Sequence, residues 1–263
     1  EEFAVACLAE AVRLRQASIT KPILVLGYTS PQDVASLVEH NLQQCVFSLE
    51  YARRLSETLS AKQMELPVHF KVDTGMGRLG FCATAGFDNA VDELCEAYGL
   101  KGLRPVGLFT HLAAADSIQP EDIVYTEEQA ALFRRVRNAL ASRGKHFLIT
   151  HLCNSAGLVT QPKTQGDMVR PGIILYGCAP SAQVNLPGLR PVLQLKATIA
   201  MIKEVPEGGQ ISYGRTFTAP CPIRVATLAA GYAHGYPRLF SGPGLVGILS
   251  VIPHCRLPQT TFS

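Results

Sequence analysis

The chain has 263 residues, of which 47% are hydrophobic and 17% are charged. At about 150 residues per domain, this length predicts one large domain or two unequal ones, and the composition excludes a disordered or low-complexity chain. Lys and Arg number 24 against 21 Asp and Glu, and this near balance without charge runs argues against nucleic-acid binding. The longest apolar stretches, 22–27 and 225–230, are far shorter than the roughly 18 residues of a membrane helix.

Apolar runs of β character alternate with segments of helical period along the first two thirds of the chain. This pattern predicts βα units around a parallel sheet. The seven expected strands are 3–6, 23–26, 45–48, 68–72, 106–110, 147–150 and 168–170. The expected helices are 8–15, 31–40, 50–59, 88–98 and 126–143, the last with an N-cap at Thr126.

Seven consecutive units predict an α/β fold of the (β/α)8 TIM-type barrel class. Because such a barrel closes with eight strands and the chain opens on a strand, we expect the eighth unit to precede Glu1. After Gly177 the helical period gives way to short β runs, 194–205, 211–217 and 223–230, between Pro, Gly and Ser. We therefore expect a truncated barrel over 1–180 and the start of a truncated C-terminal β domain over 181–263.

The eight cysteines are dispersed, with no C-x-x-C pair and no histidine at zinc-finger spacing. We interpret them as reduced thiols of a cytoplasmic protein, mostly buried as small apolar groups, and we expect no metal site. They are Cys7, Cys45, Cys82, Cys95, Cys153, Cys178, Cys221 and Cys255.

Polar residues at the ends of four expected strands are the candidates for chemistry, because a parallel barrel carries its active site there. They are Lys71 with Arg78, His111, Asn154 with Ser155, and Arg170 with Gly172 and Ile173. The Ser155 hydroxyl and the backbone N–H groups after the last strand form the usual phosphate site of such barrels. A phosphorylated ligand is expected, while His151 stays open between a structural and a functional role.

Six segments, in order along the chain, closely resemble the motifs of alanine racemases, the fold-type III pyridoxal-phosphate enzymes. They are 71–80, 110–116, 151–156, 169–177, 212–216 and 231–233. The resemblance implies a pyridoxal 5'-phosphate enzyme that interconverts L-alanine and D-alanine for peptidoglycan synthesis. It also implies a head-to-tail homodimer in which each barrel's site is completed by the partner's β domain.

The resemblance assigns the proton-transfer machinery to two residues. Tyr232 matches the catalytic tyrosine that comes from the partner subunit, and His111 matches the residue that holds this tyrosine. Racemisation removes a proton from one face of the substrate Cα and delivers one to the other face, so it needs two flanking bases.

The resemblance also assigns the binding residues. Arg170 matches the arginine that faces the pyridine nitrogen, and Arg78 matches the arginine at the cofactor's phenolic oxygen and the substrate carboxylate. Lys71 matches a lysine that is often carbamylated and then orients Arg78. The expected cofactor contacts are Ser155, Gly172, Ile173 and Asn154. We expect Arg170, Ser155 and His111 to converge on one cradle.

Two departures from the family pattern bear on activity. None of the eight lysines lies in the Lys-Ala-Asn-Ala-Tyr-Gly segment that binds the cofactor covalently, and 248–263 matches no family motif. We therefore expect this chain to be inactive alone, and to aggregate because one edge of its sheet is unpaired. The alternatives are a racemase for serine or several amino acids, and a non-catalytic fragment that binds pyridoxal phosphate or phosphate, or that dimerises.

Overall fold

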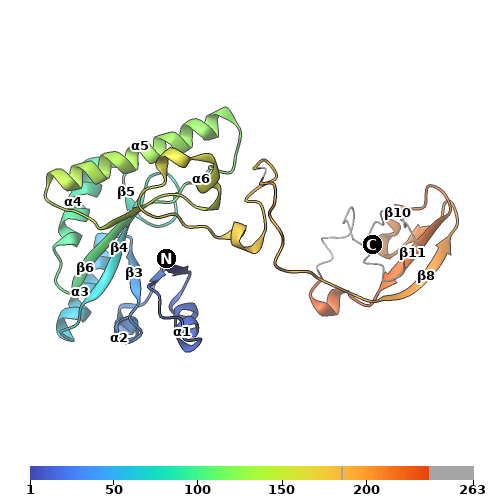
Figure 1. The fold of residues 1–263 in the computed structure, drawn as a ribbon, viewed down its shortest axis with the longest axis horizontal. Helices are drawn as coiled ribbons and strands as arrows, with labels where there is room; N and C mark the ends of the chain where they lie inside the picture. The colour runs from blue at the N-terminus through green and yellow to red at the C-terminus, as the bar shows by residue number, and fades with distance from the viewer. Residues whose placement is uncertain (185, 237–263) are drawn as a thin grey trace. The chain divides into compact units, whose positions relative to one another are not determined.

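The computed structural model describes residues 1–184 and 186–236. Contacts between Cα atoms divide the chain into two units, Glu1–Val192 and Leu193–Ser263, and each unit is described by itself (Figure 1). No helix in the described ranges is long and apolar enough to cross a membrane.

The first unit is built on a parallel sheet with the strand order β1-β2-β3-β4-β6-β7. The short strand β5 (Phe81–Cys82) pairs with β4 outside this path. The six strands of the path are β1 (Phe3–Val5), β2 (Ile23–Val25), β3 (Gln43–Val46), β4 (Leu66–Asp73), β6 (Leu103–Phe109) and β7 (Ile149–His151). The parallel βα architecture and the partial TIM-type barrel expected from the sequence are confirmed.

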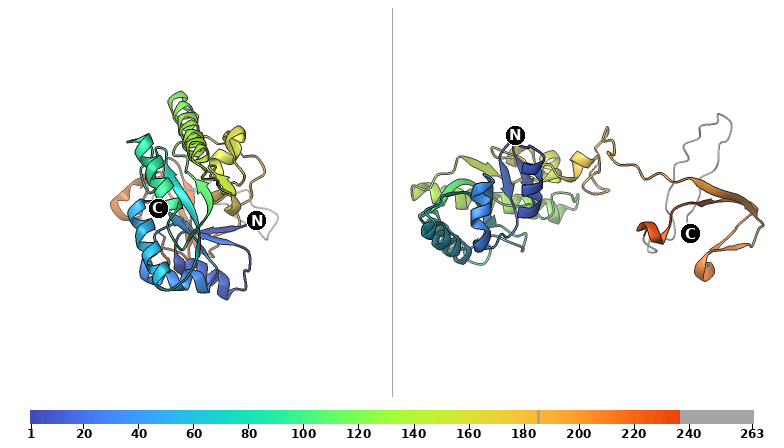
Figure 2. Two further views of the ribbon diagram at one scale, coloured as in Figure 1. Left: turned by 90° about the vertical axis from the view of Figure 1, so that its left-hand side faces the viewer. Right: turned by 90° about the horizontal axis from the view of Figure 1, so that it is seen from below.

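Helices connect successive strands and surround the outside of the curled sheet (Figure 2). They are α1 (Leu8–Gln16), η1 (Pro31–Asp33) continuing into α2 (Val34–Glu39), α3 (Leu49–Ala61), α4 (Phe87–Tyr98), α5 (Pro120–Ser142) and α6 (Ser155–Thr160). Their apolar faces form one core with the strands, because a parallel sheet must be covered on its outer face. The largest fully buried side chains include Phe70, Phe81 and Phe133.

The prediction of a seventh strand at 168–170 is wrong, because this segment forms only one isolated β-bridge, between Met168 and His151. Asp167 causes the interruption, because its carboxylate accepts the backbone N–H of Thr150 at 2.8 Å and the Thr150 hydroxyl at 2.6 Å. That N–H is therefore unavailable to a ladder. The segment still runs beside β7, since Arg170 donates its backbone N–H to the Cys153 carbonyl at 2.9 Å.

The expected N-cap at Thr126 is also wrong. Helix α5 begins two turns earlier at Pro120, and the Thr126 hydroxyl donates to the Asp122 carbonyl inside the helix. Proline at the first helical position and the acidic residues Glu121 and Asp122 in the first turn both favour the earlier start.

The second unit contains two antiparallel pairs, β8 (Ile199–Val205) with β11 (Ile223–Leu228) and β9 (Gln210–Ile211) with β10 (Phe217–Thr218). The expected run 211–217 is not continuous, because η4 (Tyr213–Arg215) interrupts it. Ser212 and Arg215 have φ of 65° and 52°, a region that no strand residue occupies. The short helix η5 (Tyr232–His234) follows β11.

The expectation that the cysteines are mostly buried is wrong for the described residues. Cys45 and Cys153 are buried and Cys95 is half-buried, whereas four others are exposed: Cys7, Cys82, Cys178 and Cys221. All seven are free thiols. Cys255 lies outside the described residues.

Candidate active site

The loop after β4 is folded by its own aspartate. The Asp73 carboxylate accepts the backbone N–H groups of Gly75 at 2.9 Å and Gly77 at 3.1 Å, which wraps the loop around it. Gly80 closes the loop at a φ of 139°, and a Cβ there would lie 2.5 Å from the Asp73 nitrogen, so only glycine fits. The loop presents Arg78 to solvent.

Two cations face one aromatic ring in the interior. The Lys71 ammonium on β4 lies 5.8 Å from the centroid of the Phe109 ring, and the Arg170 guanidinium carbon lies 5.3 Å from it. Neither cation takes part in the two ion pairs found among the described residues. Burial lowers the pKa of Lys71, with further lowering from Arg78 and Arg170. Burial also lowers the pKa of Arg170, to about 10, so its guanidinium stays charged at neutral pH.

Arg170 is held by the ends of two neighbouring strands. Its Nη2 donates to the Thr110 carbonyl at 2.7 Å, beyond β6, and to the Leu152 carbonyl at 2.9 Å, beyond β7. Its Nη1 donates to Nδ1 of His151 at 2.6 Å. These contacts fix the plane of the guanidinium, as a recognition group for a flat ligand requires.

His111 lies between Arg170 and Asn154. Its Nδ1 is 3.4 Å from Nη2 of Arg170, and its Nε2 is 3.4 Å from Nδ2 of Asn154. Burial, with Arg170 second, lowers the pKa of His111 to about 4, so the ring is neutral. A neutral imidazole has a single acceptor nitrogen, so only one of these two contacts can be a hydrogen bond at a time.

A buried polar cluster holds the segment that carries His111. Gln129 of α5 donates to the His111 carbonyl at 3.2 Å and accepts the Ala113 N–H at 2.9 Å. The Thr74 and Thr110 hydroxyls meet at 2.8 Å beside it. The ends of β4 and β6 are therefore joined to α5 by side chains.

Ser155 and Gly172 also meet. The Ser155 hydroxyl accepts the Gly172 N–H at 2.8 Å, which places the segment 170–172 against the start of α6. Asn154 caps this helix, because its side-chain oxygen accepts the Gly157 N–H at 3.0 Å. Ile173 follows Gly172 at the start of η3 (Ile173–Tyr176).

Tyr232 belongs to the second unit and is 53% exposed at the start of η5. His234 closes this turn by accepting the Gly231 N–H at Nδ1, at 3.3 Å. The structure thus brings Arg170, His111 and Asn154 into one cluster and joins Ser155 to Gly172.

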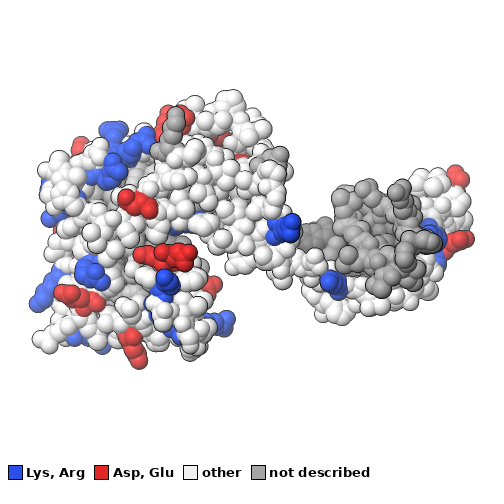
Figure 3. Space-filling view, viewed as in Figure 1, with Lys and Arg blue, Asp and Glu red and all other residues white. Residues whose placement is uncertain are grey.

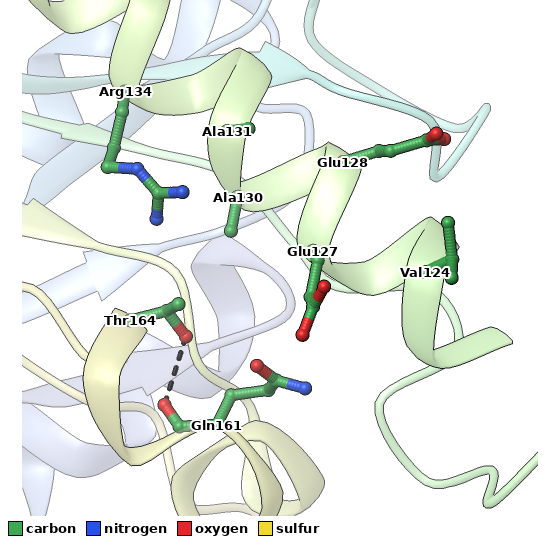
Figure 4. A pocket seen from close by; sticks show the side chains of 8 residues that line it. All are labelled: Val124, Glu127, Glu128, Ala130, Ala131, Arg134, Gln161 and Thr164. Carbon is green, nitrogen blue, oxygen red and sulfur yellow. Dashed lines mark hydrogen bonds between the residues drawn. The ribbon is translucent and has the colours of Figure 1, made fainter. Parts of the chain in front are cut away.

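Other surface features lie away from these residues. A pocket of about 480 Å³ lies between α5 and 161–164, where Glu127 and Gln161 project from opposite walls (Figure 4). None of the candidate residues lines it. On the face drawn in Figure 3, both signs of charge are distributed over the first unit. Among the described residues, no group of three or more His, Cys, Asp or Glu could hold a metal ion.

Sequence reasoning missed three residues that contact these groups: Phe109, Gln129 and His69, whose Nδ1 lies 2.9 Å from Nε2 of His151. His69 and Phe109 lie inside apolar strands, where each resembles an ordinary core residue. Gln129 lies in the middle of a long helix. The signal that could have found His69 is a polar side chain in a strand buried on both faces.

Comparison with known proteins assigns both units. Residues 1–180 match the family model described as "Alanine racemase, N-terminal domain", and residues 192–251 match "Alanine racemase, C-terminal domain". An alanine racemase of Desulforamulus reducens is 42% identical over 246 residues, which are 93% of this chain and 65% of that protein. The chain thus spans less than two thirds of that relative's length.

Solved structures agree. The structure of alanine racemase from Clostridium difficile 630 has a TM-score of 0.80 at 37% identity, covering 94% of this chain and 63% of that one. The structure of alanine racemase from Bacillus anthracis with bound L-Ala-P has a TM-score of 0.75 at 31% identity, covering 98% of this chain and 69% of that one.

Proposed function

This chain belongs to the alanine racemase family, and from that premise we propose that it forms the cofactor- and carboxylate-binding part of a pyridoxal-phosphate-dependent alanine racemase. The observation that carries the proposal is the Arg170 guanidinium, fixed between the ends of β6 and β7 within reach of His111. We further propose a cytoplasmic homodimer that makes D-alanine for peptidoglycan.

The chemistry of the donor set fits pyridoxal phosphate. Lys71 and Arg170 form no ion pair with a carboxylate of the described residues, so an anionic aromatic ligand would complete the environment of these two cations. Ser155, Asn154 and the N–H groups of Gly172 and Ile173 would hold the phosphate. Arg170 would face the ring nitrogen. When bound, the cofactor supplies an electron sink for the carbanion at the substrate Cα.

Each residue has a role that follows from its charge. Arg170 keeps its own proton, because its pKa of about 10 lies well above neutrality, so it would face the ring nitrogen as a hydrogen-bond donor without protonating it. The exposed Arg78 is free to bind the substrate carboxylate. Burial lowers the pKa of Lys71 and so raises the fraction of neutral amine, the form that reaction with carbon dioxide to a carbamate requires.

We propose that His111 serves proton transfer at the catalytic tyrosine, which is Tyr232 of the partner subunit in the proposed homodimer. A neutral ring with two competing 3.4 Å contacts can change the nitrogen that carries its proton, which suits the partner of a base that gains and loses protons. A tyrosine acts as a base at neutral pH only where nearby cations or hydrogen bonds favour its phenolate.

Two measurements test the function. First, binding of pyridoxal phosphate to this chain is followed by absorbance, with Ser155→Ala against Ser142→Ala, whose hydroxyl is exposed. We expect the first variant alone to weaken binding, by about tenfold for one charge-assisted hydrogen bond.

Second, the complete product of the gene is assayed for conversion of L-alanine to D-alanine with the cofactor present. A faster rate with serine would favour the broader racemase, and cofactor binding without turnover of either amino acid would reject the enzyme.

A further inference from the structure

A line of polar groups runs from the half-buried Arg170 through two buried histidines of the sheet. Nη1 of Arg170 lies 2.6 Å from Nδ1 of His151, and Nε2 of His151 lies 2.9 Å from Nδ1 of His69. Both imidazoles are completely buried. The two histidines come from β7 and β4, strands that are not neighbours because β6 lies between them.

Gly107 of β6 makes this contact between non-neighbouring strands geometrically feasible. It is the residue opposite His69, and a Cβ on it would lie 2.2 Å from Nδ1 of His69. The pairing of β4 with β6 is shifted just before this point, since Val68 pairs with Pro105 and His69 with Gly107. Without the shift His69 would lie opposite Val106. Proline, which lacks a backbone N–H, is typical at such irregularities.

The hydrogen-bond pattern fixes the protons on both rings. A guanidinium nitrogen can only donate, so Nδ1 of His151 accepts and carries no proton. Burial lowers the pKa of both rings, that of His69 to about 4, so both are neutral. His151 therefore carries its proton on Nε2 and donates it to Nδ1 of His69. His69 must then carry its own proton on Nε2, a buried atom with no hydrogen-bond partner among the described residues.

We propose that His69 is a positioning residue whose Nδ1 accepts the Nε2 proton of His151 and thereby holds Nδ1 of His151 toward Arg170. Without this acceptor, His151 would bury an unpaired N–H, or would move its proton to Nδ1 and place two donors face to face. The Phe109 ring supports the arrangement by stacking on His151 at 4.6 Å and 5°. The importance of this line for racemisation rests on the proposed function of Arg170.

The test is nitrogen-15 NMR of the chain labelled at its seven histidines, with each ring assigned by single replacement. Nuclei with and without a proton resonate far apart, so the tautomer is read directly and without cofactor. In the parent chain we expect His151 and His69 each to be protonated on Nε2 only. A proton on Nδ1 of His151 would overturn the proposal before any variant is made.

Variants then test the role of His69. In His69→Leu the acceptor is lost, and we expect the ratio of the Nδ1 to the Nε2 tautomer of His151 to rise about tenfold. In His69→Asn, whose side-chain oxygen replaces the acceptor at the Nδ1 position, the parent ratio should return. The matched control His146→Asn, at an exposed side chain, should leave His151 unchanged. An unchanged ratio in His69→Leu would refute the positioning role.

A racemisation assay distinguishes the positioning role of His69 from the proposed function of the chain. In a racemising protein, His69→Leu should lower kcat about tenfold while KM stays within twofold, because His69 acts behind Arg170 and contacts no substrate. Equal changes in kcat and KM would count against positioning. Absence of racemisation in the parent would reject the proposed function and would leave the NMR result to decide the assignment of His69.

Discussion

Replacing Gly107 with alanine tests the packing on which the polar line depends. The new Cβ would lie 2.2 Å from Nδ1, 2.5 Å from Cε1 and 2.8 Å from Cγ of His69. Favourable contacts between heavy atoms lie at about 3.5 Å or more, so the ring must move by roughly 1 Å or the strands must separate. Both residues are buried, so neither change can be made toward solvent.

The cost has two parts. Overpacking a core typically costs about 1–3 kcal/mol. Displacing His69 also breaks its bond to His151 and leaves buried donors unpaired, which adds about 1–3 kcal/mol. We therefore expect Gly107→Ala to lower the free energy of unfolding by about 2–5 kcal/mol, a large share of the roughly 5–15 kcal/mol of a typical domain.

Urea unfolding of a double-mutant cycle measures this cost. Gly107→Ala is compared in the parent and in a His69→Ala background, where the ring is absent and the methyl group has room. We expect Gly107→Ala to cost at least about 1 kcal/mol less in the His69→Ala background than in the parent, because the overpacking contribution is then relieved. The control Gly99→Ala, at an exposed helix end with its nearest atom at 3.6 Å, should stay within about 0.5 kcal/mol of the parent. Equal costs of Gly107→Ala in both backgrounds would refute the close contact.

Three further predictions concern a buried histidine, a buried amide and the free cysteines. The pKa of His69 is about 4 in the folded chain and near 6.5 when unfolded, so its contribution to stability is full above pH 6.5 and is lost as the pH falls toward 4. Between these two pKa values the free energy of unfolding should fall by about 1.4 kcal/mol per pH unit as the pH is lowered. The urea midpoint should therefore be lower at pH 5 than at pH 7 in the parent chain, and the difference should be smaller in His69→Asn. Gln129→Leu should cost about 1–2 kcal/mol by unpairing the Ala113 N–H and the His111 carbonyl; a cost equal to that of the exposed Asn138→Leu would contradict this. In native protein, a thiol reagent followed by mass spectrometry should modify the exposed Cys7, Cys82, Cys178 and Cys221 but not Cys45 or Cys153, and early labelling of Cys45 would disprove its burial.

The sequence predicts the parallel architecture well because apolar strand runs and helical period are local patterns. The strands at 23–26 and 68–72 are found within two residues of their expected bounds. The seventh strand fails because the Asp167 side chain competes with a backbone ladder, which no hydrophobic pattern reveals. The start of α5 differs from the prediction because Thr126 and Pro120 are both typical of helix starts, and the helix begins at the proline.

The residues of the candidate site are likewise only partly predictable from the sequence. Arg170, His111 and Asn154 could be selected as polar residues at strand ends, and they do contact one another. His69 could not, because its partner His151 lies 82 residues away and two strands over. Only the register of β4 against β6, with its shift after Val68, places them together.

Two apolar residues of β6 determine which polar groups can meet. Gly107 and Phe109 are two positions apart and lie on the same face of the strand, so one leaves an opening and the next provides a platform. Inserting or deleting a residue in β6 ahead of Gly107 would bring Val106 or Leu108 into register with His69 and would close the passage. The route between two imidazoles is thus encoded in the sizes of side chains that carry no charge, and a survey restricted to ionisable residues would overlook it.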